Sequence, residues 1–186
     1  MDRRQRKTRQ AVFSAFTELL SHKKYSGITI GEIIDKADIG RATFYSHFET
    51  KDYLLKELCK ELFCHVFDSL DGNKNKHCHV FECDSDENVF LHLLRHLEKN
   101  DNNVSKLVVG ENNELFVMYF KKELKQLIAG QRELTEFAKS KNIPEDFWIN
   151  HVSSCFVETV KWWLCENKRE TPEKIYKYFL GVLGIG

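Results

Sequence analysis

The chain has 186 residues, of which 42% are hydrophobic and 30% charged, as in globular proteins with one or two small domains. It holds two prolines and nine glycines, a scarcity that favours long helices. It contains no run of about 18 apolar residues, which argues against a membrane-spanning helix. The basic N-terminus lacks the apolar segment and cleavage site of a signal peptide, so we expect a cytoplasmic protein.

The formal net charge of zero hides an asymmetry along the chain. Residues 1–51 hold ten basic and six acidic residues, a net +4, whereas the remainder holds 18 and 22, a net −4. A basic module followed by an acidic body is typical of a DNA reader with a separate domain. The six cysteines come without signs of secretion, so we expect reduced thiols.

The first predicted helix runs from about Arg3 to Ser21. Five of the seven residues between Arg3 and Arg9 are basic, and an apolar stripe follows at Val12, Phe13, Phe16, Leu19 and Leu20. Positive charge at a helix N-terminus is unfavourable for the helix dipole. The basic cluster is therefore interpreted either as a solvated helix start or as a surface that faces phosphate.

The second predicted helix begins at Thr29 with strong start signals. Thr29 and Glu32 have the spacing of a capping box, and Ile28 and Ile33 that of a hydrophobic staple. Its core face is formed by Ile30, Ile33, Ile34 and Ala37. Residues 38–40 form a turn in which we expect Gly40 to adopt a φ that other residues resist.

The third predicted helix, Arg41 to Phe48, has two different sides. Phe44 and Phe48 point inward together, and the outer side carries Ala42, Ser46, Thr43 and Tyr45, with His47 near the boundary. Small outer side chains let a backbone approach a DNA groove closely, and Arg41 suits bidentate contact with guanine. The alternative for Arg41 is an exposed arginine near a helix start.

These residues resemble a known family. The runs TIGEI (29–33), GRATFYSHF (40–48) and KDYLL (51–55) are similar to the DNA-binding domain of TetR-family transcriptional regulators, over about residues 8 to 56. The resemblance implies an all-helical homodimer with one helix-turn-helix per subunit. Many members have serine where Gly40 stands, so Gly40 is given no side-chain role.

The resemblance also implies site residues. It assigns phosphate contacts to Thr29, Tyr45, His47 and Lys51, and base contacts to Arg41, Ala42 and Thr43. Ser46, on the same outer side, completes the predicted DNA-binding set. Thr50 is expected to cap a fourth helix from Lys51 to about Leu70.

The stretch from Asp71 to Asn88 is polar and contains His77, Cys78, His79 and Cys83. Such side chains bind zinc and other transition metals, but their spacing matches no standard zinc finger. Ordinary loop histidines and thiols are the favoured interpretation, and we predict neither a metal site nor a cofactor.

Helices are predicted at 89–99, 104–110, 112–131, 145–167 and 172–183. The aromatic residues of the first three of these helices, 89–99, 104–110 and 112–131, could wall a pocket for a small apolar ligand, although core packing explains each residue at least as well. Val160–Trp163 resembles the C-terminal domain of a TetR-like subgroup from low-GC Gram-positive bacteria. The last two helices are predicted to form a four-helix dimer interface through Val152, Cys155, Phe156, Thr159, Trp162, Trp163, Tyr176, Phe179 and Leu183.

We therefore predict an all-α fold of about nine helices, with a helix-turn-helix DNA-binding domain at 1–50 and a dimerisation and effector domain at 51–186. The predicted function is a homodimeric repressor that reads a palindromic, double-stranded DNA operator. The alternatives are a ligand- or metal-responsive sensor and a regulator that acts through a protein partner. No Gly-rich phosphate loop, Gly-x-Ser-x-Gly elbow or HExxH motif is present, so we do not expect an enzyme.

Overall fold

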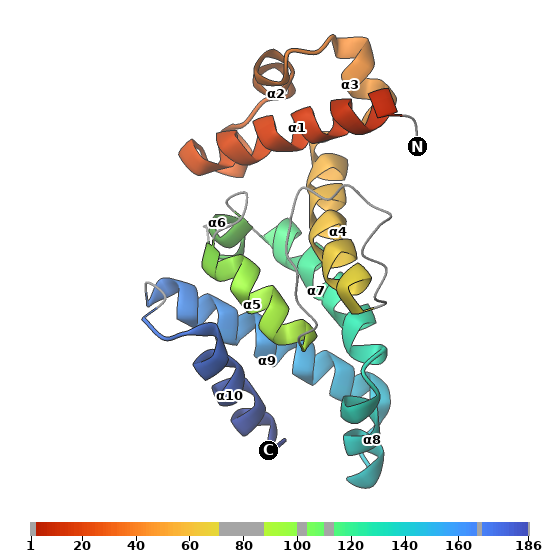
Figure 1. The fold of residues 1–186 in the computed structure, drawn as a ribbon, viewed down its shortest axis with the longest axis vertical. Coiled ribbons are helices and arrows are strands. Elements are labelled where there is room, and N and C mark those ends of the chain that lie inside the picture. The colour runs from red at the N-terminus through yellow and green to blue at the C-terminus, as the bar shows by residue number, and fades with distance from the viewer. Residues whose placement is uncertain (1–2, 71–87, 100–103, 110–113, 167–168, 186) are drawn as a thin grey trace.

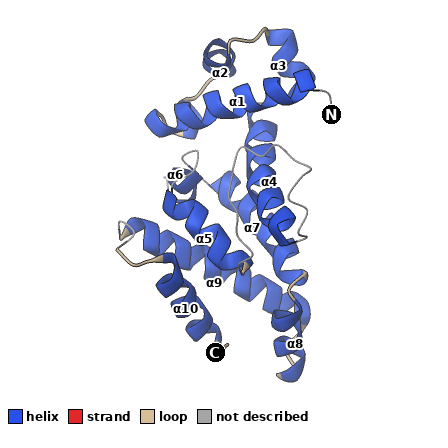
Figure 2. Ribbon diagram, in the orientation of Figure 1, coloured by secondary structure: helices blue, strands red, loops and turns tan. Residues whose placement is uncertain are grey.

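The computed structural model describes residues 3–70, 88–99, 104–109, 114–166 and 169–185. Within these ranges the chain is helical and contains no strand (Figure 2). The α-helices are α1 (Arg3–His22), α2 (Ile30–Ala37), α3 (Arg41–His47), α4 (Lys51–Leu70), α5 (Val89–Lys99), α6 (Val104–Val109), α7 (Glu114–Ala129), α8 (Arg132–Ser140), α9 (Glu145–Cys165) and α10 (Pro172–Leu183), and η1 (Tyr25–Gly27) is a 3₁₀ turn.

The all-α prediction is confirmed, but one helix was missed. Helix α8 was not predicted because only Leu134 and Ala138 among its residues are buried, which leaves a thin apolar stripe. The predicted 112–131 helix instead ends at Ala129, since the backbone turns at Gly130 and Gln131 and Gln131 precedes the new helix. The described residues therefore contain ten α-helices instead of about nine.

Helices α1 to α3 form a head, and α4 to α10 form a body (Figure 1). Figure 1 shows α1 between α2 and α3 on one side and the body on the other, with α4 leading from the head alongside α7. In the head, Phe13, Phe44 and Phe48 are fully buried, and the Phe13 and Phe48 rings meet edge to face at 5.6 Å. The predicted inward direction of Phe44 and Phe48 is confirmed.

The turn between α2 and α3 corrects one prediction. Gly40 has φ −77° and ψ 154°, an extended conformation open to any residue, and it precedes α3 as the N-cap. The left-handed conformation falls at Asp38, with φ 51° and ψ 52°, where the residue ends α2. The expectation for Gly40 was wrong because aspartate tolerates this conformation better than most residues do.

The body has an aromatic core. Phe63 of α4 packs on Phe120 of α7 at 5.1 Å between ring centroids, and Phe90 of α5 lies 5.1 Å from Phe156 and 5.0 Å from Phe179. Burying each such ring contributes about 1.5–3 kcal/mol. These contacts join α4, α5, α7, α9 and α10 around one interior.

The structure describes only some of the cysteines and histidines that the sequence singled out. The histidines and cysteines at 77, 78, 79 and 83 lie outside them. Among the residues described, Cys59, Cys155 and Cys165 are free thiols. Within the same ranges, no helix has the length and apolar character needed to span a membrane.

Candidate nucleic-acid interface

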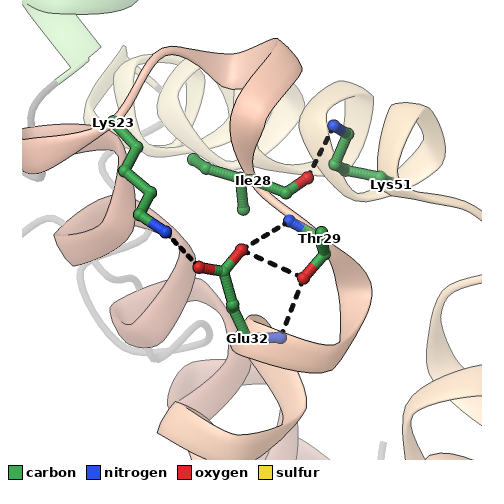
Figure 3. A network of polar contacts seen from close by, with 5 residues as sticks. All are labelled: Lys23, Ile28, Thr29, Glu32 and Lys51. Atoms are coloured by element: carbon green, nitrogen blue, oxygen red, sulfur yellow. Dashed lines mark hydrogen bonds and ion pairs between the residues drawn. The ribbon is translucent and has the colours of Figure 1, made fainter.

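The start of α2 is fixed by the predicted capping box (Figure 3). The Thr29 hydroxyl accepts the Glu32 amide at 3.2 Å, and the Thr29 amide donates to the Glu32 carboxylate at 2.9 Å. Lys23, beyond the end of α1, donates to the same carboxylate. The Lys23 and Thr29 hydrogen bonds lower the pKa of Glu32 to about 2. The Thr29 side chain is therefore engaged within the head, and α2 has a defined entry point.

Helices α2 and α3 are joined by residues 38–40 and share the buried face of the head, which is the arrangement of a helix-turn-helix. On the other side of α3, a continuous exposed surface is formed by Arg41, Ala42, Thr43, Tyr45 and Ser46. His47 is half-buried at its edge. The structure thus brings together six of the eight predicted DNA-binding residues on one short helix.

Ser46 and Tyr45 on this surface both have contacts within α3. Ser46 donates its hydroxyl to the Thr43 carbonyl at 2.7 Å, so it caps its own helix turn. Tyr45 is 48% exposed while its ring edge rests on Phe44 at 5.5 Å between centroids. The contact with Phe44 therefore supports a Tyr45 ring that is half exposed at the surface.

His47 is the titratable residue at the boundary. Burial, followed by the positive charge of Arg9, lowers its pKa below the ordinary 6.5. A pKa below 6.5 favours the neutral imidazole at pH 7, which still carries one N–H donor. Protonation below this lowered pKa would add a positive charge at the edge of α3.

The basic cluster of α1 is not uniform. Arg3, Arg4, Arg6 and Lys7 are exposed, as a phosphate-facing surface requires. Arg9 differs: its guanidinium lies 5.1 Å from the Phe48 ring centroid and 5.3 Å from that of Phe13. It also pairs at 3.2 Å with Glu57 of α4, whose pKa is lowered by Lys60 and Arg9 against the effect of burial. Arg9 connects head and body.

Lys51 is the first residue of α4, and its ammonium is engaged by the residues before α2. Its ammonium donates to the carbonyl oxygens of Tyr25 and Ile28, both at 2.8 Å (Figure 3 shows the Ile28 bond). It also lies 4.3 Å from the centroid of the Tyr25 ring. Two of its three N–H donors are thus used inside the protein, and one remains for another acceptor.

The predicted dimer residues fall into two groups. Val152, Phe156, Trp163, Phe179 and Leu183 are buried inside the single chain, so their side chains present no outer surface. Cys155, Thr159 and Tyr176 are half-buried, and Trp162 is 51% exposed. The apolar side chains that do face outward also include Phe147 on α9 and Tyr178 and Val182 on α10, which the sequence prediction omitted.

A small hollow lies among α5, α8 and α10. Its volume is about 70 Å³, and its lining includes Phe90, Leu134, Tyr176 and Leu180 together with the polar Gln131 and Glu133. Many of the aromatic residues proposed as pocket walls, such as Phe116 and Phe120 of α7, instead pack in the core. Among the described residues, no group of three or more metal-ligating side chains gathers at one point.

Sequence reasoning missed the contacts between head and α4. Arg9 precedes Phe13 by four residues, a helical spacing that signals stacking of its side chain on the ring. Tyr25 and Asp52 are 27 residues apart, and their side chains are hydrogen-bonded. A long-range pair of this kind leaves no local pattern in the sequence.

The geometry defines a helix-turn-helix DNA-binding protein, and comparison with known proteins places it further. Residues 13–58 match the bacterial regulatory proteins of the tetR family, and residues 84–183 match a transcriptional regulator C-terminal region. A TetR transcriptional regulator of known structure from Streptococcus agalactiae is 34% identical, with a TM-score of 0.70 over 97% of this chain and 96% of that one. The chain belongs to the TetR family and is a DNA-binding transcriptional regulator.

Two further relatives match over shorter stretches. The dhaKLM operon transcriptional activator DhaS of Lactococcus lactis is 25% identical over 132 residues, 70% of this chain and 65% of that protein. An uncharacterized HTH-type transcriptional regulator of Bacillus subtilis, YxbF, is 41% identical over 71 residues, 38% of this chain and 19% of that protein. The matched stretches span less than two thirds of either relative. The family and fold are those of transcriptional regulators and not of enzymes.

Proposed function

We propose that the chain is a cytoplasmic homodimeric repressor that places α3 of each subunit in the major groove of a palindromic operator. The observation that carries this proposal is the outer surface of α3, where Arg41, Ala42 and Thr43 are exposed side by side at the helix start. The N-terminal residues of a recognition helix are the ones that reach base edges. Arg41 supplies the bidentate donor that guanine accepts, and Ala42 leaves room for close approach.

Phosphate contacts position this helix without reading sequence. Tyr45 and His47 flank the base-reading residues, and the exposed cations of α1 lie in the same head. Thr29 gives both its hydroxyl proton and its backbone N–H to the Glu32 carboxylate, so a phosphate contact from Thr29 requires its hydroxyl to turn away from Glu32. Each neutralised phosphate should steepen the salt dependence of binding.

A dimer is supported by the outer surfaces of α9 and α10. Phe147 and Trp162 are separated by 15 residues, so they share one side of α9, and both are more than half exposed. Tyr178 and Val182 are one helical turn apart on α10 and are also exposed. Exposed large apolar side chains on two adjoining helices are typical of an interface between subunits. These four residues replace the five buried ones in our proposed interface, beside Cys155, Thr159 and Tyr176.

The hollow among α5, α8 and α10 is our candidate site for a small apolar ligand. Phe90, Leu134 and Leu180 give it an apolar lining, while Gln131 and Glu133 supply polar groups at its edge. Pockets of this composition fix a ligand by burial and orient it by a few polar contacts. Bound there, a ligand would touch α8 and α10 at once.

The proposal is tested by selecting bound fragments from random DNA with the full chain, followed by gel-shift titration of the enriched sequence. We expect an inverted repeat and a preference over unrelated DNA of at least about a thousandfold. Binding without sequence preference would overturn the proposal. A reporter gene placed behind the selected operator then separates repression from activation, which matters because the relative DhaS is named an activator.

A further inference from the structure

The head and α4 are joined by a very short connection. Helix α3 ends at His47 and α4 begins at Lys51, so residues 48–50 alone link them. Thr50 accepts the Tyr53 amide at 3.0 Å and starts α4 as predicted. Such a connection fixes the distance between the two helices. Their relative direction depends on what the first turn of α4 contacts.

The first turn of α4 contacts the η1 turn and the residue before α2. We call this contact the α4 junction and define it by Lys51, Asp52, Tyr25 and Ile28. Lys51 bonds the carbonyls of Tyr25 and Ile28, each at 2.8 Å, and Asp52 accepts the Tyr25 hydroxyl. Three bonds from two adjacent residues hold α4 against the loop that feeds the helix-turn-helix.

The chemistry of the α4 junction explains why a lysine stands there. Ile28 is 1% exposed and has an extended backbone before α2, and its carbonyl accepts a hydrogen bond from the Lys51 ammonium. The Lys51 ammonium also rests over the Tyr25 ring at 4.3 Å, and that ring packs edge to face on Phe16 of α1 at 6.3 Å. The Lys51 cation therefore makes three contacts with two residues of the head, and the Tyr25 ring links this cluster to α1.

Charge at the α4 junction is consistent with a permanent contact. Burial lowers the pKa of Lys51 while neighbouring Asp52 opposes that effect. Burial and the Asp52 hydrogen bond raise the pKa of Tyr25 far above its usual range, so the phenol keeps its proton. The Tyr25 hydroxyl is therefore available as the donor to Asp52 at neutral pH.

We propose that Lys51 is a positioning residue, which sets the angle between the head and α4 through Tyr25 and Ile28 instead of contributing mainly a phosphate contact. This inference rests on the proposed dimeric, operator-reading function. In such a dimer each head is carried by its own α4, so that angle fixes how far apart the two α3 helices lie. The α4 junction thereby selects the spacing between operator half-sites.

The experiment uses the full chain as wild type, Lys51→Met and Tyr25→Phe, with Lys7→Met as the matched control. Lys7 is an exposed cation of α1 without a contact to α4 in the described structure. Each protein is titrated on the selected operator at several salt concentrations. It is then titrated on operators whose half-sites are one base pair closer together or farther apart.

For Lys51→Met we expect the salt slope to stay at the wild-type value. The wild-type penalty for a one-base-pair change, on the order of tenfold, should fall to about threefold or less. Tyr25→Phe removes only the hydroxyl that bonds Asp52, and it serves as the second variant in case Lys51→Met does not fold. It should change the spacing preference in the same direction as Lys51→Met. Lys7→Met should leave the spacing preference unchanged.

A phosphate role makes the opposite prediction. If Lys51 mainly binds phosphate, Lys51→Met reduces the salt slope by about 1.8 for two subunits and leaves the spacing preference intact, which would overturn the inference. An unchanged spacing preference in Tyr25→Phe and Lys51→Met together would overturn it as well. A wild type that prefers no operator refutes the proposed function itself, so the two failures are distinguishable.

Discussion

The outer surface of α3 and the contacts between the head and α4 contain similar polar side chains but use them differently. Arg41 and Tyr45 face solvent with their polar ends outward. Arg9 and Tyr25 bond Glu57 and Asp52 of α4, and the Arg9 guanidinium lies over the Phe48 ring while the Tyr25 ring packs edge to face on Phe16. The comparison teaches that residue type alone does not distinguish a DNA contact from a support. What distinguishes them is whether the polar atoms already have partners in the folded chain.

The largest effect is expected at Arg41. Arg41→Ala should weaken operator binding by about 1–3 kcal/mol per half-site, because the bidentate donors to guanine are lost. Thermal stability should stay within about 0.5 kcal/mol of wild type, since the side chain is exposed. Gel-shift titration and thermal unfolding measure the two quantities. Arg132→Ala, at an exposed residue of α8, serves as the control, and equal losses in both variants would remove Arg41 from the reading surface.

The second-largest effect is expected at Arg9, which belongs to the contacts between the head and α4. Arg9→Ala should destabilise the fold by about 1–2 kcal/mol, because it removes the Glu57 ion pair and two ring contacts. Arg6→Ala, three residues away and exposed, should change stability by less than about 0.5 kcal/mol and reduce the salt slope of DNA binding. Chemical denaturation of both variants tests this. Equal stability of the two would mean that the α1 cations form one uniform surface.

The smallest effect is expected at Gly40. Its extended backbone is open to serine, and a Cβ there would meet its nearest neighbour, the Thr43 hydroxyl, at 3.8 Å. Gly40→Ser should add a side-chain cap to α3 and stabilise the head by a few tenths of a kcal/mol. Gly184→Ser is the contrasting variant. Gly184 has φ 68°, a conformation that serine adopts poorly, so this substitution should lower the free energy of unfolding. A loss of stability in Gly40→Ser would show that the turn needs glycine after all.

The head could be predicted from sequence because its determinants are local. The Thr29 and Glu32 capping box, the Thr50 cap and the inward Phe44 and Phe48 depend on spacings of three or four residues, and all are confirmed. The exception was the turn between α2 and α3. A left-handed φ was predicted for Gly40, whereas Asp38 adopts it.

The body could be predicted less well because its faces are decided by packing between distant helices. The sequence prediction assigned Val152, Phe156, Trp162 and Trp163 alike to the dimer interface, because helical spacing does not show which apolar side chains the single chain buries. The structure buries Val152, Phe156 and Trp163 and leaves Phe147 and Trp162 outside. The partners of Arg9 and Tyr25 were likewise hidden, because they lie 48 and 27 residues away.

The central claim is that the outer residues of α3 read bases in a symmetric operator, whereas Arg9, Tyr25 and the other residues that join the head to α4 do not. The most direct measurement is parallel selection from one random DNA library by the wild type and by Arg41→Ala. We predict an inverted repeat for the wild type and, for the variant, loss of preference at one symmetric pair of guanine positions with the rest of the repeat retained. An identical repeat from both proteins would contradict the account.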